Sequence, residues 1–404
     1  MISLPRLAIR VCAILFLVST VSLVSSASAV VRQEAISTAA YPIGLAHDAA
    51  GNVYIANEND GTLTVVPAVT GTLFGQSVTA GQESTLVRFT SSQKAVGLAV
   101  DAQNDLLYSR NDGSVFAITA AARTIFGVTT VANIPTLIIS GTSMLGPLEF
   151  DTAGNLYGVA LSRGKLFVLP AATGTLFGVS VTANTPTQIF DFTSRWLWDV
   201  AIDPAGNILV SDGWSVSPGV YMLPHQDATV YGEVVTANTF VKLAAFGSDR
   251  RAGIDSDAVG NIFVAAYGSH VDVYSPTGGS MFGQAIAPES LTRLSETARS
   301  GITNQGVLIT GAGDLVTGGA NATYRTYADS PTPTPTPTLT STPTPTLTST
   351  PAISELSKTG RTNPVWPPVI GAASALIVGA MLLRKFSRPK NVVDSARRKS
   401  RLKP

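Results

Sequence analysis

The sequence predicts an all-β fold, a closed six-bladed β-propeller, and three observations lead to this prediction. A short apolar strand runs into the turn Asp-x-x-Gly-Asn, or a variant of it, six times along the chain. The fourth positions of these turns are 53, 50, 52, 54 and 53 residues apart, a period typical of propeller blades or of a solenoid. The last repeat lacks a strand, which a segment before the first repeat matches. The turns are 48–52, 101–105, 151–155, 203–207, 257–261 and 310–314.

Each repeat reads as four strands between turns rich in Gly, Asn and Asp. In the first repeat the apolar or alternating segments are 43–47, 53–56, 62–67 and 85–89. The connection from the third strand to the fourth has a signature of its own, an aromatic residue followed by glycine. Because it recurs from repeat to repeat, we interpret it as a ring packed under a tight bend. The five copies are Phe74-Gly75, Phe126-Gly127, Phe177-Gly178, Tyr231-Gly232 and Phe282-Gly283.

The two ends of the repeat region complete one blade. The sixth repeat offers three strands, 307–309, 315–317 and 324–327, and then the composition changes. Residues 30–36 precede the first repeat as 85–89 precede the second, so we expect them to form the missing strand. Such pairing removes two open sheet edges. A solenoid would instead need capped ends, and we therefore favour the propeller over a β-helix.

Composition limits the class of protein. With 45% hydrophobic and 13% charged residues the chain is too apolar to be disordered. Its formal charge is only +1, but residues 30–330 contain 24 acidic and 14 basic residues, a net charge of −10. An acidic body argues against binding to nucleic acid.

The N-terminus predicts export. Arg6 and Arg10 precede the apolar run 11–24, and Ala27-Ser28-Ala29 follows, which together indicate a signal peptide over 1–29. The only cysteine, Cys12, would leave with it, so we expect no disulfide and no thiolate metal site in the mature chain. The propeller domain is then 30–328.

The C-terminal part predicts an anchor in three segments. Residues 329–363 are rich in Pro and Thr and favour an extended polyproline II stalk. Residues 364–383 are a candidate transmembrane segment, since Val365–Leu383 carries no charge. Residues 384–404 are basic, as expected of a cytoplasmic tail. The sequence therefore predicts display at the cell surface.

A short motif leaves the type of anchor open. It consists of Leu356, Ser357, Lys358, Thr359 and Gly360. Followed by an apolar segment and a basic tail, it resembles the Leu-Pro-x-Thr-Gly cell-wall sorting signal of bacterial surface proteins. The resemblance implies a sortase as partner, cleavage after Thr359 and attachment to the cell wall. Ser357 departs from the family pattern, which has proline there, so a retained membrane anchor is the alternative.

The repeat also carries a family resemblance. The segment Gly-Leu-Ala-His-Asp-Ala-Ala-Gly-Asn-Val-Tyr-Ile-Ala, residues 44–56, resembles the NHL-repeat propellers and, more distantly, the gluconolactonase-like propellers. The resemblance implies the six-bladed fold but no single function, since propellers include hydrolases, lyases and binding modules.

Gluconolactonase-like enzymes hold a divalent cation over the channel with Glu, Asn and Asp, some just before the inner strand. In this chain that position is held by Ile43, Val96, Gly146, Trp198, Ala252 and Gln305. None is a carboxylate, whereas hard cations need several oxygen ligands. The Asp-x-x-Gly-Asn turns are explained by hydrogen bonds without calcium. We therefore expect no cofactor, although Glu149, Asp199 and Asp255 leave open a displaced site for calcium or another divalent cation.

The fourth repeat is the most irregular and supplies the candidate ligand site. Its entry segment 195–199 and the connection 212–219 hold three of the four tryptophans and should emerge on one face. Exposed aromatic residues beside polar ones suit a glycan or a peptide, although tryptophans packed between blades are the plainer interpretation. The candidate residues are Trp196, Trp198, Asp199, Asp212, Trp214, Arg163, Arg250 and Arg251.

From the sequence alone we expect a cell-surface binding module for an extracellular glycan or protein, without catalytic residues and not an enzyme. The alternative is a gluconolactonase-like, metal-dependent hydrolase or lactonase. A purely structural component of the cell envelope is a third possibility.

Overall fold

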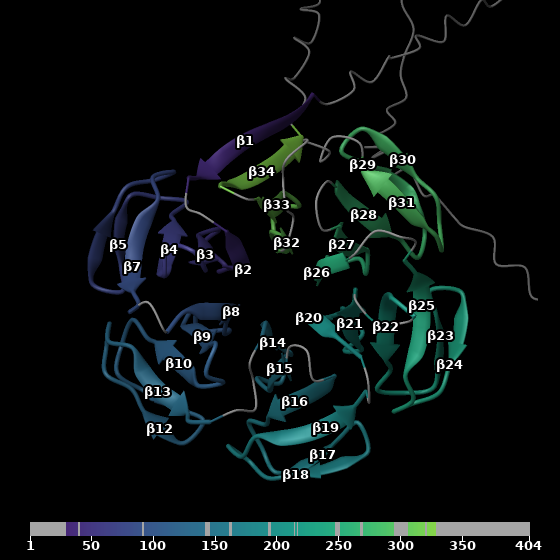
Figure 1. Cartoon of the computed structure of the whole chain (residues 1–404), viewed down its shortest axis with the longest axis horizontal. Helices are drawn as coiled ribbons and strands as arrows, with labels where there is room; N and C mark the ends of the chain where they lie inside the picture. The colour runs from purple at the N-terminus through teal and green to yellow at the C-terminus, as the bar shows by residue number, and fades with distance from the viewer. Residues whose placement is uncertain are drawn as a thin grey trace, which may run out of the picture. The chain divides into compact units, whose positions relative to one another are not determined.

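The computed structural model shows an all-β, six-bladed propeller around a central channel (Figure 1). It describes residues 30–328 except for 39–40, 91–92, 142–145, 161–163, 193–194, 214, 216, 247–250, 267–269, 295–305 and 320. In these residues no helix is both long enough and apolar enough to span a membrane. The predicted signal peptide, stalk, sorting motif and transmembrane segment lie outside the described residues.

Each blade is a four-stranded antiparallel sheet. The apolar segments form the strands and the predicted turns connect them. The first three blades, from the channel outward, are β2 (Pro42–His47), β3 (Val53–Asn57), β4 (Thr62–Val66) and β7 (Ser84–Arg88); β8 (Ala95–Val100), β9 (Leu106–Arg110), β10 (Val115–Ile118) and β13 (Thr136–Ile139); and β14 (Leu148–Phe150), β15 (Leu156–Ala160), β16 (Lys165–Leu169) and β19 (Thr187–Asp191).

The remaining three blades follow the same order. They are β20 (Leu197–Ile202), β21 (Ile208–Asp212), β22 (Gly219–Leu223) and β25 (Val241–Ala245); β26 (Arg251–Ser256), β27 (Ile262–Ala266), β28 (His270–Tyr274) and β31 (Leu291–Leu294); and β32 (Val307–Ile309), β33 (Leu315–Gly318), β34 (Thr323–Ala328) and β1 (Val31–Ser37).

The N-terminal strand closes the ring, as predicted. Strand β1 pairs antiparallel with β34, and Ala35 lies opposite Tyr324 (Figure 1). The sixth sheet therefore joins the two ends of the described chain, and the closure leaves neither β34 nor β1 without a partner on that side.

The Asp-x-x-Gly-Asn turns are closed by the hydrogen bonds that the sequence predicts. In the first, Asp48 Oδ1 accepts the amide hydrogens of Ala50 at 3.0 Å and Asn52 at 2.9 Å. Gly51 has a φ of 85°, a value that glycine adopts without strain. Asn52 also accepts the amide hydrogen of Ala68 at 2.9 Å, which ties the turn to the end of the third strand. The structural interpretation of these turns is confirmed.

The aromatic-Gly signature forms a small hairpin on the rim of five blades. Phe74 and Gly75 both have positive φ, 45° and 75°, as the central residues of a type I′ turn require. The Phe74 ring is buried, so the predicted ring under a tight bend is confirmed. The two short strands that flank each turn were not predicted. They are β5 (Gly71–Leu73) with β6 (Gln76–Val78), β11 (Thr124–Ile125) with β12 (Val128–Thr129), β17 (Gly174–Leu176) with β18 (Val179–Val181), β23 (Ala228–Val230) with β24 (Glu233–Val235), and β29 (Gly279–Met281) with β30 (Gln284–Ile286).

Hydrophobic clusters fill the spaces between adjacent blades. Next to the channel the inner strands approach closely, because small residues face one another there. A Cβ added to Gly97 would lie only 2.3 Å from the carbonyl oxygen of Gly146 on the next blade. This close approach narrows the channel and brings side chains of different blades within reach of one another.

Candidate active site in the central channel

The central channel contains a cavity of about 180 Å³ bounded by inner-strand residues of all six blades. Many of the lining residues are aliphatic, for example Leu98 and Val307, but the surface that faces the cavity is mainly polar. Glu149, Asp199 and Asp255 are its carboxylic residues, and His47 also lines it. Burial removes water from a carboxyl group and so shifts its pKa, which makes these three carboxyl groups the candidate reactive groups.

The three carboxyl groups face the channel because of their positions along the inner strands. Glu149 on β14 and Asp255 on β26 each stand two residues before the first residue of their turn, and Asp199 on β20 stands four before. Side chains on a strand alternate between its two sides, so positions separated by an even number point the same way. The residues tested against the gluconolactonase-like pattern stand five before the turn.

Two of these carboxylates bridge neighbouring blades. Asp199 accepts the amide hydrogen of Ile254 on the next inner strand at 2.9 Å, and that of Val200 at 2.8 Å. Asp255 repeats the arrangement one blade further, accepting the amide hydrogen of Ile309 at 2.7 Å. These bonds satisfy amide groups at the inner edge of the sheets and fix the orientation of the carboxylates.

The three carboxyl groups differ in pKa because burial and neighbouring charges affect each of them differently. Burial raises the pKa of Glu149 well above its usual value, and the charges of Asp255 and Asp199 raise it further. Burial also raises the pKa of Asp199 to about 8 and that of Asp255 to about 6, although the amide hydrogen bonds oppose both shifts. His47 lowers the pKa of Asp255 in addition. Asp255 therefore loses its proton more readily than Asp199, and Glu149 holds its proton more strongly than an ordinary glutamic acid.

The described carboxylates are not grouped as a divalent-cation site of the kind that the family resemblance implies. Both oxygens of Asp255 accept amide hydrogens, from Ser256 and Ile309, and both oxygens of Asp199 do the same. Within the part of the chain that the structure describes, no three His, Cys, Asp or Glu side chains are placed to hold a metal ion. The displaced cation site considered from the sequence is not formed by these residues.

The ligand site predicted in the fourth blade is only partly assembled. Asp212 is buried and accepts a hydrogen bond from Arg195 Nη1 at 3.2 Å, and the Arg195 guanidinium lies 4.3 Å from the centre of the Tyr221 ring. The entry segment and the connection after β21 therefore do meet on one face. Lys242, which sequence reasoning missed, donates to Ser217 Oγ at 3.0 Å beside them.

Of the other predicted residues, three can be placed. Trp196 is 46% exposed, Trp198 is half-buried on β20, and Asp199 belongs to the channel. Arg251 opens β26, and its side chain lies outside the described residues. Three further candidates also lie outside them: Trp214, Arg163 and Arg250.

The comparisons with known proteins identify the fold. No protein-family model matches the chain, and no curated protein matches it significantly. A gluconolactonase from Xanthomonas campestris is 13% identical, with a TM-score of 0.51 over 74% of this chain and 91% of that one. A Thermus thermophilus protein assigned as an oxidoreductase (glucose dehydrogenase) is 16% identical, with a TM-score of 0.50 over 74% and 100%. A PQQ-bound aldose sugar dehydrogenase from Streptomyces coelicolor is 13% identical, with a TM-score of 0.49 over 74% and 98%.

These similarities show the six-bladed propeller and, at such low identity, the fold alone. They also correct one expectation drawn from the sequence, that the protein is not an enzyme. Two of the solved propellers, with TM-scores of 0.51 and 0.50, are described as enzymes. Three carboxyl groups with raised pKa values do face the channel, and from the sequence we considered them only as a displaced cation site.

Proposed function

We propose that this protein is an exported propeller hydrolase that opens small esters or lactones with the carboxyl groups of its central channel. One observation carries the proposal: Asp255, with a pKa of about 6, shares a cavity with Asp199, whose pKa is about 8, and with Glu149, which is raised as well. Groups whose surroundings push their pKa values to opposite sides of neutrality are suited to act as base and acid in one reaction.

Each carboxyl group then has a role. Ionised Asp255 takes a proton from water as its oxygen bonds to the carbonyl carbon. Protonated Glu149 donates a hydrogen bond to the carbonyl oxygen as negative charge develops there. Protonated Asp199 gives its proton to the leaving alkoxide when the ester carbon–oxygen bond breaks. One proton then passes from Asp255 to Asp199 through water, which restores the starting state.

The cavity limits the size of the reacting group. Its volume of about 180 Å³ equals that of about six water molecules at roughly 30 Å³ each. A five- or six-membered lactone ring or a short acyl group fits this space, whereas a polymer would have to enter by one end. The similarity to the Xanthomonas gluconolactonase supports the class of reaction and, at 13% identity, not a particular sugar.

Hydrolysis of a panel of lactones and short-chain esters by the full-length protein tests the proposal. Asp255→Asn should lower the rate by about 100-fold or more, the usual worth of a general base. Asp191→Asn is the matched control, since Asp191 is an exposed partner of Lys165 on β16 at 3.6 Å. Hydrolysis that is unchanged in Asp255→Asn, or that is abolished by a chelator and restored by a cation, would contradict this assignment.

The proposed location follows the sequence. After removal of 1–29, the stalk would hold the propeller outside the membrane, with Val365–Leu383 as the span or as a temporary stop before sortase action. The mass of the mature C-terminus distinguishes the two: an end at Thr359 means wall attachment, and an end at Pro404 means a retained anchor.

A further inference from the structure

Five of the spaces between adjacent blades are closed in the same way, by an aromatic ring from a rim hairpin. The aromatic residue of each rim hairpin stands eight residues after the last residue of its blade's third strand, and its ring joins the hydrophobic cluster against the following blade. The rings belong to Phe74, Phe126, Phe177, Tyr231 and Phe282, and several of the hairpins are visible on the rim in Figure 1.

The rings make specific contacts with the following blade. Phe126 of the second blade stacks on Phe150 of the third, with ring centres 6.3 Å apart and planes inclined by 2°. Tyr231 of the fourth blade donates its hydroxyl hydrogen to the carbonyl oxygen of Gly260 in the fifth, at 2.9 Å. The aromatic ring of the rim hairpin therefore joins its blade to the following blade and does not pack only against its own blade.

The tip of each hairpin also rests on the next blade. A Cβ added to Gly75 would lie 3.2 Å from Asn133 Cγ, and one added to Gly127 would lie 3.3 Å from Asn184 Nδ2. Asn133 and Asn184 both have positive φ, at corresponding loop positions in their blades. In the first blade the corresponding position is Gly81, whose amide hydrogen bonds to the Pro67 carbonyl in the same way.

The space between the sixth and first blades lacks this closure among the described residues. Its cluster consists of Val53, Ile55, Val66, Leu308 and Val316, with Ile36 and Leu45 packed against it, and contains no aromatic ring. A Cβ added to Gly81 would meet nothing within 4 Å.

An open groove occupies this space instead. We name it the sixth-seam groove: a cavity of about 660 Å³ lined by Ile36, His47, Ala50, Val66 and Gly81 among others. The corresponding cavity between the second and third blades, where the Phe126 ring forms part of the wall, is about 370 Å³. His47 stands at the position that Phe150 holds beneath the Phe126 ring, immediately before the turn.

We propose that the sixth-seam groove is a docking site for a β-hairpin of another protein that carries an aromatic residue followed by glycine at its turn. The five closed seams of this chain show the chemistry that such a groove accepts: an aromatic ring against aliphatic walls and a glycine at the tip. The ion pair between Arg325 and Asp314, at the mouth of the groove, adds a polar rim.

The segment that follows the sixth blade in the sequence does not carry the aromatic–glycine pair. Residues 329–338, which continue from the third strand of the sixth blade, contain neither an aromatic residue nor glycine. A second copy has no spare hairpin either, because its five hairpins close its own seams. In this proposal we therefore assign the occupant to a different protein.

The test uses the full-length protein and a labelled peptide with the sequence of residues 70–80, cyclised at its ends because an isolated hairpin is only marginally stable. Fluorescence anisotropy should show saturable binding, and the same peptide with Phe74→Ala should bind at least tenfold more weakly. In the protein, Ala50→Trp should reduce binding at least tenfold, because Ala50 is exposed at the edge of the groove.

Ala205→Trp is the matched control, since Ala205 holds the same turn position in the fourth blade, beside a seam that Phe177 already closes. It should bind the peptide as the unchanged protein does. Absence of binding, or equal binding by Ala50→Trp, overturns the proposal. A self-association that Ala50→Trp dissolves would assign the groove to a second copy and overturn it too.

Discussion

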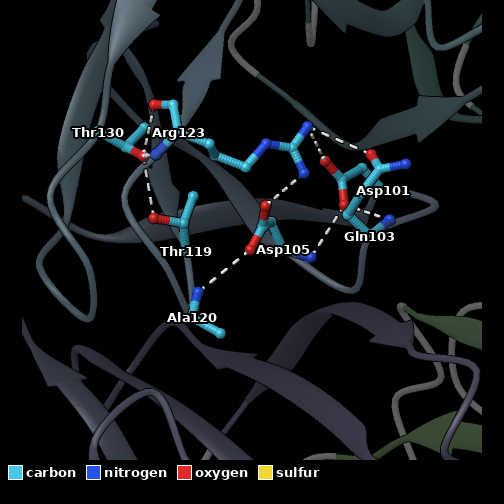
Figure 2. Close-up of polar contacts among 7 residues, drawn as sticks. All are labelled: Asp101, Gln103, Asp105, Thr119, Ala120, Arg123 and Thr130. Carbon is cyan, nitrogen blue, oxygen red and sulfur yellow. Dashed lines mark hydrogen bonds and ion pairs between the residues drawn. The ribbon is translucent and has the colours of Figure 1, made fainter.

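Arg123 donates a hydrogen bond from Nη1 to Asp105 Oδ2 at 2.8 Å, at a turn position where four of the six blades have asparagine (Figure 2). In the first blade that asparagine, Asn52, donates to the carboxylate of Asp48. Asp105 has no such hydrogen to give and places a second negative charge beside Asp101. Arg123 offsets both changes, because it also lies 3.3 Å from Asp101 Oδ2.

The sixth blade shows the same exchange. Asp314 replaces the asparagine there, and Arg325 Nε donates to its Oδ2 at 2.9 Å. The arginine comes from the third strand in the sixth blade and from the loop after the third strand in the second. Both turns that have aspartate in place of the asparagine therefore pair it with an arginine, which compensates the charge of that aspartate.

Arg123→Met should lower the free energy of unfolding by about 2 kcal/mol, because it leaves the buried Asp105 carboxylate beside Asp101 without its charged donor. Burial and Asp101 already raise the pKa of Asp105, and Arg123 opposes them. Urea unfolding checks the value. The double variant with Asp105→Asn should recover most of the lost free energy of unfolding. If the losses of the two single variants simply add in the double variant, Arg123 does not compensate the charge of Asp105.

Gly75→Ala should destabilise the protein by about 1–2 kcal/mol, since alanine is strained at a φ of 75° and its Cβ would crowd Asn133. Gly71→Ala in the same hairpin is the control. Gly71 does not have a positive φ, and a Cβ there meets nothing within 4 Å, so its change should stay within about 0.5 kcal/mol. Thermal unfolding of the two variants compares them, and equal losses would contradict the role given to the turn.

The fold was predictable because the spacing of the turns, the alternation of apolar residues and the incomplete last repeat all indicate the same closed ring. The period of the turns fixed six blades, and the alternation of apolar residues placed the strands of the first repeat within a residue or two of β2, β3, β4 and β7. The pairing of Ala35 with Tyr324 was also predicted, since an incomplete last repeat leaves one free edge for one spare strand.

The candidate site was harder to predict, because it depends on distances between blades. From the sequence we grouped Glu149, Asp199 and Asp255 only as a displaced cation site, and nothing local indicates how burial changes the pKa of each. Their common position, two residues before the turn, was the available signal. The five-before position taken from the family resemblance drew attention to Ile43 and Trp198 instead.

The short rim strands were missed for another reason. Phe74 and Gly75 were recognised as a bend, but strands of two or three residues give too little alternation to detect. The difference between five closed seams and one open seam becomes visible only when the rings are placed in three dimensions.

The stability of the protein should fall as the pH rises from about 4 to above 8. The pKa of Asp199 is about 8 in the folded protein and near its ordinary value of about 4 when unfolded, so the folded state binds the extra proton in this range. Stability from this group is complete below the unfolded pKa and is lost as the pH passes the folded one. Unfolding in urea at several pH values measures the slope.

Asp199→Asn removes this titration, so its stability should depend less on pH between 4 and 8 than that of the unchanged protein. Its absolute stability at low pH will be lower, because an amide has one oxygen for the two amide hydrogens of Val200 and Ile254. Only the slope tests the prediction. An unchanged slope would place the titration elsewhere.

The rate of ester or lactone hydrolysis should follow a bell-shaped dependence on pH. It should rise as Asp255 loses its proton near a pKa of about 6, since only the ionised form can take a proton from water. It should fall as Asp199 loses its proton near a pKa of about 8, because the leaving alkoxide then has no donor. Initial rates at saturating substrate across this range measure both limbs. In Asp199→Asn the residual rate should lack the alkaline limb, and a variant that keeps it would assign the acid to another group, with Glu149→Gln as the next variant to measure.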